Sequence, residues 1–306
     1  MDVGRTANHT TTLAVRTKER DALRAVWDEV REVSLICAEA VKKSYGEAKE
    51  AMYRPWLHAA FTKLHALNLT QFDKIMLLDA DTLVNPFMVM KESAARIQAR
   101  VEKLFSVRTP AGLCSDTLGG AQVHGTPVSE EQLKDAKDKG WGMRGCIMAL
   151  KPSRDLFDNC LGELSSVRSL VKGRIGRYGD KDKFIGPDEL FFSTVLQDWH
   201  HLTPNACVTS WHLKEENETK AFFLHIVSEK VFMPQFGKRW PDYDFWLKWA
   251  IQCRDDHPET RLWLGHIIER TIKEPITYHP MYRWPFDPLD KPIKRFREAI
   301  AQGYPH

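Results

Sequence analysis

Short apolar runs alternate with segments of helical periodicity along roughly the first 250 residues of this chain. The runs have the length and composition typical of β-strands. Alternation of such runs with helices predicts an α/β fold, in which helices flank a central sheet. The strand-like runs lie at 12–17, 32–36, 74–79, 104–108, 146–151 and 221–227.

A helix is predicted just before the third run, and it carries Lys63, a candidate functional residue. Its apolar residues recur at 57, 60, 61, 64 and 67, which is the spacing of one helix face packed on a sheet. Pro55 fits a position in the first turn of this helix. Lys63 lies on the same helix and is either an ordinary surface lysine or a cation directed at a substrate phosphate.

Further helices are predicted at 154–171, 187–199, 243–251 and 259–271. Ser153 precedes the first of them as a suitable N-cap residue. The segment 110–142 reads as a long loop, and long loops in compact domains are usually functional or mobile. We therefore expect one α/β domain over 1–250 and a helical, proline-rich extension over 251–306 that packs on it.

The apolar run before residue 79 ends in Asp79-Ala80-Asp81. Side chains two apart lie on the same face of a strand, so Asp79 and Asp81 are expected to converge. Two converging carboxylates repel one another unless a cation joins them, and hard oxygen ligands suit Mg²⁺ or Mn²⁺. Such an ion keeps positions open for phosphate oxygens, which makes a nucleotide-sugar diphosphate one natural ligand. The alternative is a plain turn in which Asp79 caps Thr82.

The same region reads Phe-Thr-Lys-Leu-His-Ala-Leu-Asn-Leu-Thr-Gln-Phe-Asp-Lys at 61–74 and Leu-Asp-Ala-Asp-Thr-Leu-Val at 78–84. These two blocks resemble glycogenin and its relatives in glycosyltransferase family eight. Three further blocks follow in family order and extend the resemblance over roughly 12–245. They are Arg-Gly-Cys-Ile-Met-Ala-Leu-Lys-Pro-Ser at 144–153, Gly-Pro-Asp-Glu-Leu at 186–190, and Leu-His-Ile-Val at 224–227 with Gly-Lys-Arg-Trp at 237–240.

The resemblance implies a GT-A fold, a Rossmann-like mixed sheet flanked by helices with the metal site at its edge. It also implies a retaining transfer of a hexose from a UDP-sugar, UDP-glucose or UDP-galactose above all, with Mn²⁺ (or Mg²⁺) on the diphosphate. The acceptor would be a hydroxyl of a glycan, a polyol or a protein. Self-glycosylation cannot be judged from the sequence, and a homodimer is left open as an assembly.

Position by position, Asp79, Asp81 and His225 match the metal ligands of the family. A histidine binds metal only as neutral imidazole, so activity is expected to fall below about pH 6. Lys63 and Asp188 match residues at the reacting sugar. The other positions that match the donor site are Ala80, Arg144, Gly145, Gly237 and Lys238.

Three departures from the family affect the predicted site. The first β-α unit of the family, which holds the base, has no counterpart before residue 12. Arg144 and Gly145 replace an Asn-Ser pair. The arginine would bind an acidic group of the ligand, either a uronate sugar or a carboxylate on the acceptor. Alternatively, it would have a structural role and cover Asp188. The histidine-to-lysine spacing is long, so Lys230 competes with Lys238 for the role of phosphate lysine.

Composition narrows the function classes only slightly. A net charge of +3, with basic residues scattered among 41 acids, gives no sign of a nucleic-acid partner. Six cysteines without C-x-x-C spacing predict neither a zinc site nor a disulfide framework. No apolar run reaches membrane-span length, and a cytoplasmic protein is expected. The rival to an active transferase is a degenerate relative that binds a nucleotide-sugar or glycan without turnover; a metal-dependent phosphohydrolase is a third class.

Overall fold

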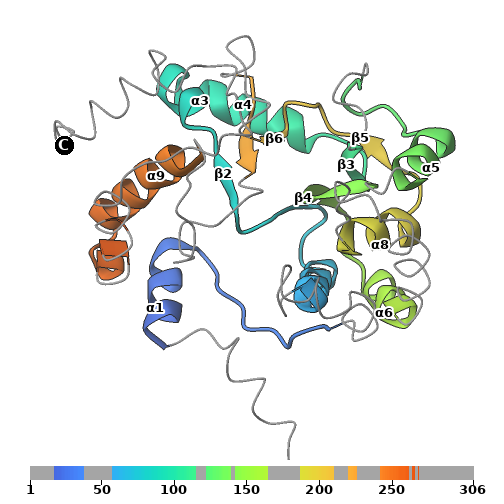
Figure 1. Cartoon of the computed structure of the whole chain (residues 1–306), viewed down its shortest axis with the longest axis horizontal. Helices are drawn as coiled ribbons and strands as arrows, with labels where there is room; N and C mark the ends of the chain where they lie inside the picture. The colour runs from blue at the N-terminus through green and yellow to red at the C-terminus, as the bar shows by residue number, and fades with distance from the viewer. Residues whose placement is uncertain are drawn as a thin grey trace, which may run out of the picture. The chain divides into compact units, whose positions relative to one another are not determined.

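The computed structural model describes residues 17–37, 57–114, 122–138, 142–164, 187–209, 220–225, 242–261, 264–265 and 268 (Figure 1). The chain divides into two compact units. One unit spans Val33–Val227, and the other combines Met1–Glu32 with Ser228–His306. The expected boundary near residue 250 is not where this division falls.

Within the described part of the unit Val33–Val227, seven strands form two mixed sheets flanked by helices, as expected for an α/β fold. The four-stranded sheet has the order β1-β4-β3-β5, with β4 antiparallel to both β1 and β3, and β5 parallel to β3. The three-stranded sheet has the order β2-β7-β6, with β2 antiparallel and β6 parallel to β7. The strands are β1 (Ile75–Leu78), β2 (Thr82–Val84), β3 (Ala111–Cys114), β4 (Met143–Leu150), β5 (His200–His201), β6 (Cys207–Thr209) and β7 (Phe223–His225).

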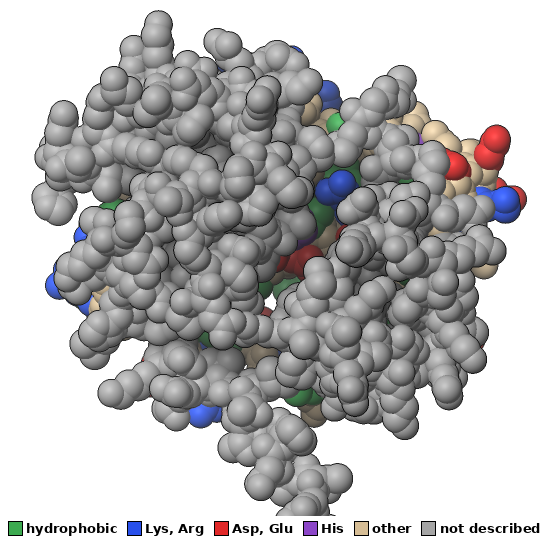
Figure 2. Space-filling view, viewed as in Figure 1, with side chains coloured by type: hydrophobic (Ala, Val, Ile, Leu, Met, Phe, Trp, Pro, Cys, Tyr) green, Lys and Arg blue, Asp and Glu red, His purple; other side chains and the backbone are tan. Residues whose placement is uncertain are grey.

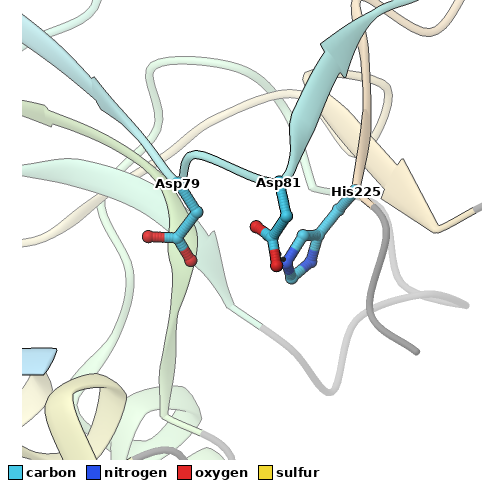
Figure 3. Close-up of side chains that lie close together, drawn as sticks. All are labelled: Asp79, Asp81 and His225. Carbon is cyan, nitrogen blue, oxygen red and sulfur yellow. Dashed lines mark ion pairs between the residues drawn. The ribbon is translucent and has the colours of Figure 1, made fainter. Parts of the chain in front are cut away.

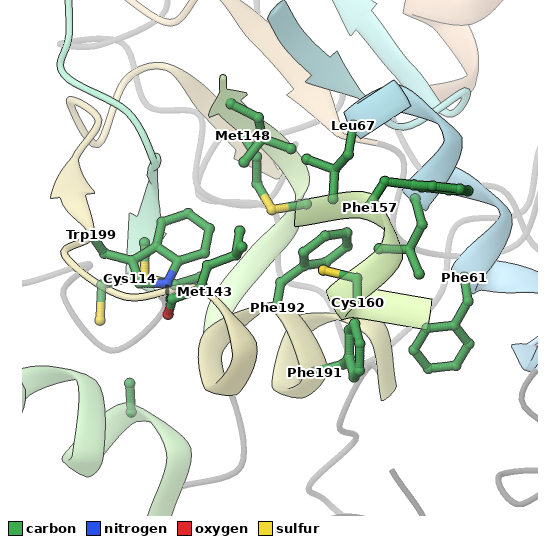
Figure 4. Close-up of a cluster of buried hydrophobic side chains, with 14 residues drawn as sticks. Phe61, Leu67, Cys114, Met143, Met148, Phe157, Cys160, Phe191, Phe192 and Trp199 are labelled. Carbon is green, nitrogen blue, oxygen red and sulfur yellow. Dashed lines mark hydrogen bonds between the residues drawn. The ribbon is translucent and has the colours of Figure 1, made fainter. Parts of the chain in front are cut away.

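Strand β4 is the centre of the larger sheet, and all of it except Arg144 is buried. Met148 and Leu150 belong to one hydrophobic cluster, whereas Ile147 and Ala149 belong to another. A strand covered on both faces reads as a continuous apolar run, which is why the sequence identified it. The first cluster, drawn in Figure 4, includes side chains from η1 (Leu57–Asn68), α5 (Glu130–Asp138), α6 (Arg154–Glu163) and α8 (Pro187–Val195). The second includes side chains from α3 (Pro86–Lys91) and α4 (Ala94–Phe105).

The helix that carries Lys63 is a 3₁₀ helix, η1. Its fully buried residues are Phe61, Leu64 and Leu67. This strict spacing of three matches the three residues per turn of a 3₁₀ helix, whereas the sequence suggested an α-helical face that included position 60. Helices α6 and α8 both pack against η1. Phe61 also meets Phe191 of α8 edge to face, with ring centroids 5.4 Å apart.

The predicted N-cap at Ser153 is confirmed, and a lysine caps the end of another helix. The Ser153 hydroxyl accepts a hydrogen bond from the Leu156 N–H at 3.3 Å, which starts α6 at Arg154. Lys74 reaches from the start of β1 to the end of α4, where its Nζ donates to the carbonyl oxygens of Phe105 at 3.0 Å and Val107 at 2.6 Å. These bonds satisfy carbonyls that the end of a helix leaves without a partner.

Five element predictions were wrong. Helix α6 ends at Glu163, before its predicted end at 171. The run at 32–36 forms no strand. It contacts η1 instead, where the Ile36 N–H donates to the Thr62 hydroxyl at 3.1 Å. The run at 104–108 covers the end of α4, and the strand begins later, at Ala111. The segment 110–142 contains β3 and α5 and is therefore more than a loop. Helix α8 ends at Val195, before the predicted end at 199.

The second unit contains α1 (Thr17–Val26), α9 (Asp242–Asp256) and η5 (Pro258–Thr260). Helix α9 confirms the helix predicted at 243–251. Ala250 of α9 packs with Leu264 and Ile268 in a small buried cluster. Among the residues that the structure describes, no helix is both long enough and apolar enough to cross a membrane.

Candidate metal and donor site

Asp79 and Asp81 lie in a turn that connects the two sheets. Strand β1 ends at Leu78, and the Asp79 N–H donates to the Cys146 carbonyl of β4 at 3.1 Å. The Thr82 N–H then donates to the backbone carbonyl of Asp79 at 3.0 Å, and the chain enters β2. The expected convergence along a single strand is therefore wrong, because a turn brings the carboxylates together. The bond to Thr82 involves the backbone of Asp79, so its carboxylate is left for other partners.

His225 reaches the same point from the end of β7. It pairs with Thr82 in the antiparallel register of β2 and β7, which places it next to Asp81. The Nε2 atom of His225 lies 3.3 Å from Oδ1 of Asp81. One ligand atom from each of Asp79, Asp81 and His225 lies within 4.8 Å of the others (Figure 3). The three residues that the resemblance named as metal ligands are thus brought together.

The donor set fits a divalent ion. Two carboxylates and one imidazole suit Mn²⁺, and the carboxylates also suit Mg²⁺. The Nδ1 atom of His225 is buried and has no hydrogen-bond partner in the part of the chain that the structure describes. Buried polar atoms without a partner are rare in proteins and require a specific explanation. A ligand at this corner of the two sheets is one such explanation.

The electrostatics of the site disfavour the neutral form of His225. Burial alone would lower its pKa, but the adjacent carboxylate of Asp81 and thiol of Cys146 raise the pKa to about 10. An imidazolium paired with Asp81 must lose its proton before the ring can bind a metal. Competition between proton and metal is therefore expected to begin well above the pH of about 6 that an ordinary histidine suggested. Burial also raises the pKa of Asp79, although Lys63 opposes this.

Lys63 joins Asp79 to Asp188. Its Nζ donates to Oδ1 of Asp79 at 2.8 Å and to Oδ2 of Asp188 at 2.6 Å. The lysine side chain is only 16% exposed, and those of Asp79 and Asp188 are 27% and 11% exposed. The surface-lysine alternative is therefore wrong. The ion pairs hold η1, the end of β1 and the first turn of α8 in one constellation.

Gly145 of β4 fits tightly against this constellation. Its N–H donates to Oε1 of Glu189 at 3.0 Å. A Cβ atom built on Gly145 would lie 2.9 Å from Oδ2 of Asp188 and 3.3 Å from Nζ of Lys63. There is no room for a side chain at this position while Lys63 and Asp188 keep their places. A side chain at the position of the family's serine would therefore require the Asp188 carboxylate and its neighbours to move.

Glu189 is a site residue that the sequence analysis missed. It follows Asp188 in the first turn of α8 and lies next to Gly145. Burial, together with the negative charge of Asp188, raises the pKa of Glu189 to about 7. Its place beside Asp188 in the block at 186–190 is the one sequence signal that points to it.

Arg144 is a partly exposed cation beside these acids. Within the described residues its guanidinium forms no ion pair and no hydrogen bond, so the alternative that it covers Asp188 structurally is not what the structure shows. Ala80 is exposed between the two metal-binding aspartates. Gly237, Lys238 and Lys230 lie outside the described residues, and the choice between the two lysines stays open.

No protein-family model matches this chain, and no curated protein gives a significant match to it. The resemblance to glycosyltransferase family eight therefore stays a prediction. The geometry of Asp79, Asp81, His225, Lys63 and Asp188 stands independently of it.

Proposed function

We propose that this protein is a retaining glycosyltransferase of the GT-A type that moves a hexose from a UDP-sugar to a hydroxyl acceptor with Mn²⁺. The observation that carries the proposal is the convergence of Asp79, Asp81 and His225 from two different sheets, with ligand atoms within 4.8 Å of one another. A glycan, a polyol or a protein is the acceptor class that the resemblance supports. UDP-glucose and UDP-galactose are the donors to test first.

The chemistry that the site must perform is charge stabilisation. Breaking the bond between the anomeric carbon and the phosphate oxygen leaves an additional negative charge on UDP. Asp79, Asp81 and His225 would hold the divalent ion, which supplies Lewis-acid stabilisation of that charge when bound. Lys63 places a fixed positive charge next to Asp79, in a partly water-excluded position where it acts more strongly than in bulk water.

Asp188 would orient the sugar from the other side of Lys63. Its Oδ2 accepts from Lys63 at 2.6 Å, so the carboxylate is fixed in position before any substrate arrives. A carboxylate held in this way can accept hydrogen bonds from sugar hydroxyls without moving. The side chains of Lys63 and Asp188 are therefore the proposed catalytic residues.

One substitution tests the proposal directly. Asp81→Asn keeps the shape of the side chain but removes a charged metal ligand. We expect transfer, measured as UDP release from UDP-glucose or UDP-galactose, to fall by more than the roughly 10- to 100-fold typical of losing a residue that merely orients a ligand. Asp73→Asn is the matched control, because Asp73 is exposed in the turn before β1. An active Asp81→Asn enzyme with undiminished Mn²⁺ dependence would refute the assignment.

A second candidate function is nucleotide-sugar or glycan binding without turnover. The observation that favours it is Gly145, because a strand with no side chain there lacks the serine hydroxyl that the family directs at the donor. Mn²⁺-dependent binding of UDP with no UDP release from any donor sugar would support this function. Release of phosphate from simple phosphate esters would instead support a phosphohydrolase.

A further inference from the structure

Strand β4 projects beyond β1 at the candidate site. The last residue of β1 that pairs with β4 is Leu78, opposite Ile147. The residues of β4 before Cys146 therefore extend past the end of β1, beside the turn that carries Asp79. Arg144 lies in this projecting part of the strand, and it is only partly buried while its neighbours on either side are buried.

The guanidinium of Arg144 lies among acidic groups and yet is paired with none of them in the described residues. Burial is the main cause of the raised pKa of Glu189, and the charge of Arg144 opposes it. A hydrogen bond with Cys207 is the main cause of the lowered pKa of Cys146, and the charge of Arg144 adds to it. The guanidinium therefore lies close enough to act on both groups. Figure 2 shows acidic, histidine and basic side chains together around the centre of the view.

The neighbouring carboxylates already have partners. Asp79 and Asp188 bind Lys63, Asp81 lies against His225, and Glu189 accepts from the Gly145 N–H. This leaves the five N–H donors of the guanidinium without an acceptor from the described protein. An arginine presents these donors as a planar fork that matches the two oxygens of a carboxylate.

The residue next to Arg144 contributes no side chain to recognition. Gly145 is confined by Asp188, Lys63 and Glu189, as its virtual Cβ distances show. Among the residues of β4 before Cys146, Arg144 is thus the one whose side chain carries a charge. A neutral hexose offers the guanidinium fork only single hydroxyl oxygens, whereas the carboxylate of a hexuronic acid offers two charged oxygens in the matching geometry and therefore a stronger contact.

We propose that Arg144 is a specificity-determining residue that binds a carboxylate on the transferred sugar, so that the preferred donor is a UDP-hexuronate. This inference rests on the proposed function and adds the substrate class to it. The same fork could meet an oxyanion from a second source, the diphosphate of the donor. The two sources are separated by ligands that share the diphosphate and differ only in the sugar.

The test is calorimetric titration, with Mn²⁺ present, of UDP, UDP-glucose and UDP-glucuronate into the wild-type protein and Arg144→Gln. We expect the wild type to bind UDP-glucuronate about 10- to 100-fold more tightly than UDP-glucose, the range of a charge-assisted bidentate contact. Arg144→Gln should lose that preference and keep its affinity for UDP and UDP-glucose. Arg144→Lys should retain part of the preference, because it keeps the charge and loses the fork.

Two controls make the outcomes unambiguous. Arg108→Gln removes the same charge at an exposed position before the start of β3, which is the end of β3 that lies away from Arg144. It should not change the affinity for any of the three ligands. The thermal unfolding midpoint of Arg144→Gln should equal that of the wild type, because the side chain makes no bond to the described protein. A change in that midpoint of more than a few degrees would show a structural role and overturn the inference.

The remaining outcomes decide between the inference and the function on which it rests. Equal weakening of all three ligands in Arg144→Gln would mean that the arginine binds the diphosphate, and no weakening of any would mean that it touches no donor. Either result overturns the inference while the proposed function stands. A wild-type protein that binds neither UDP nor UDP-glucose with Mn²⁺ would overturn the proposed function itself.

Discussion

Replacing Lys63 with methionine tests how the candidate site is held together. Methionine keeps most of the length of the side chain but removes the cation between Asp79 and Asp188. The two ion pairs have N–O distances of 2.8 and 2.6 Å, and all three side chains are mostly buried. Removing one partner of a buried ion pair typically costs about 3–5 kcal/mol, because the other charge remains buried without compensation.

The expected loss is large enough to measure in a domain of this size. Proteins are stable by about 5–15 kcal/mol, so the variant would lose a substantial share of its free energy of unfolding. For domains of about 150–250 residues, each kcal/mol lowers the unfolding midpoint by about 2–4 °C, which gives a decrease of about 6–20 °C. Urea unfolding followed by circular dichroism at pH 7 provides the free energy directly. Lys103→Met, on the exposed surface of α4, is the control and should shift it by less than about 0.5 kcal/mol.

The pH dependence of the same difference identifies its cause. Burial raises the pKa of Asp79, and Lys63 opposes that rise. In Lys63→Met the Asp79 carboxyl should therefore bind a proton at higher pH than in the wild type, and the penalty should shrink as the pH falls toward 4. The double variant Lys63→Met/Asp188→Asn should also be less destabilised than the sum of the two single variants. A difference below about 1 kcal/mol at pH 7, or one that does not change with pH, would refute the reasoning.

Two further predictions concern Glu189 and Gly145. The pKa of Glu189 rises from its usual 4.5 to about 7 on folding, so the folded wild type should lose up to about 3 kcal/mol of stability as the pH rises through that interval. Glu189→Gln has no proton to lose and should show no such decline; urea unfolding at pH 5 and pH 8 measures it, and parallel declines in both proteins would contradict the assignment. Gly145→Ala should destabilise the protein by about 1–3 kcal/mol because its Cβ would lie 2.9 Å from Oδ2 of Asp188. Gly162→Ala in α6, where a Cβ would have nothing within 4 Å, is the control and should be neutral or stabilising, and equal effects of the two substitutions would be the contrary result.

The parts of the fold that depend on local signals could be predicted from the sequence. Strand β4 was recognisable because both of its faces are buried, and the start of α6 because Ser153 caps it. The run at 104–108 was misassigned because short apolar segments are equally compatible with a strand and with the last turn of a buried helix. Leu104 and Val107 are both buried, and Ser106 between them ends α4.

The candidate site was predictable in its residues and not in its geometry. Local spacing indicated that Asp79 and Asp81 would meet, but the turn that brings them together depends on a bond to Cys146 in another strand. The role of Lys63 depends on Asp188, which lies 125 residues away along the chain. The periodic pattern of apolar residues along a helix or strand does not reveal such long-range contacts. Glu189 was missed for the same reason, because its partner Gly145 lies in a distant strand.

The central claim is that Asp79, Asp81 and His225 hold one divalent ion. Anomalous diffraction from crystals soaked in MnCl₂ tests it most directly, because it locates the ion without reference to any activity. The account predicts one strong manganese peak that lies close to all three side chains. Its distance from one ligand atom of each should be roughly 2.0–2.6 Å, the range typical of hard divalent ions. Fully soaked crystals with no peak at this position, or with a peak bound only by other residues, would contradict it.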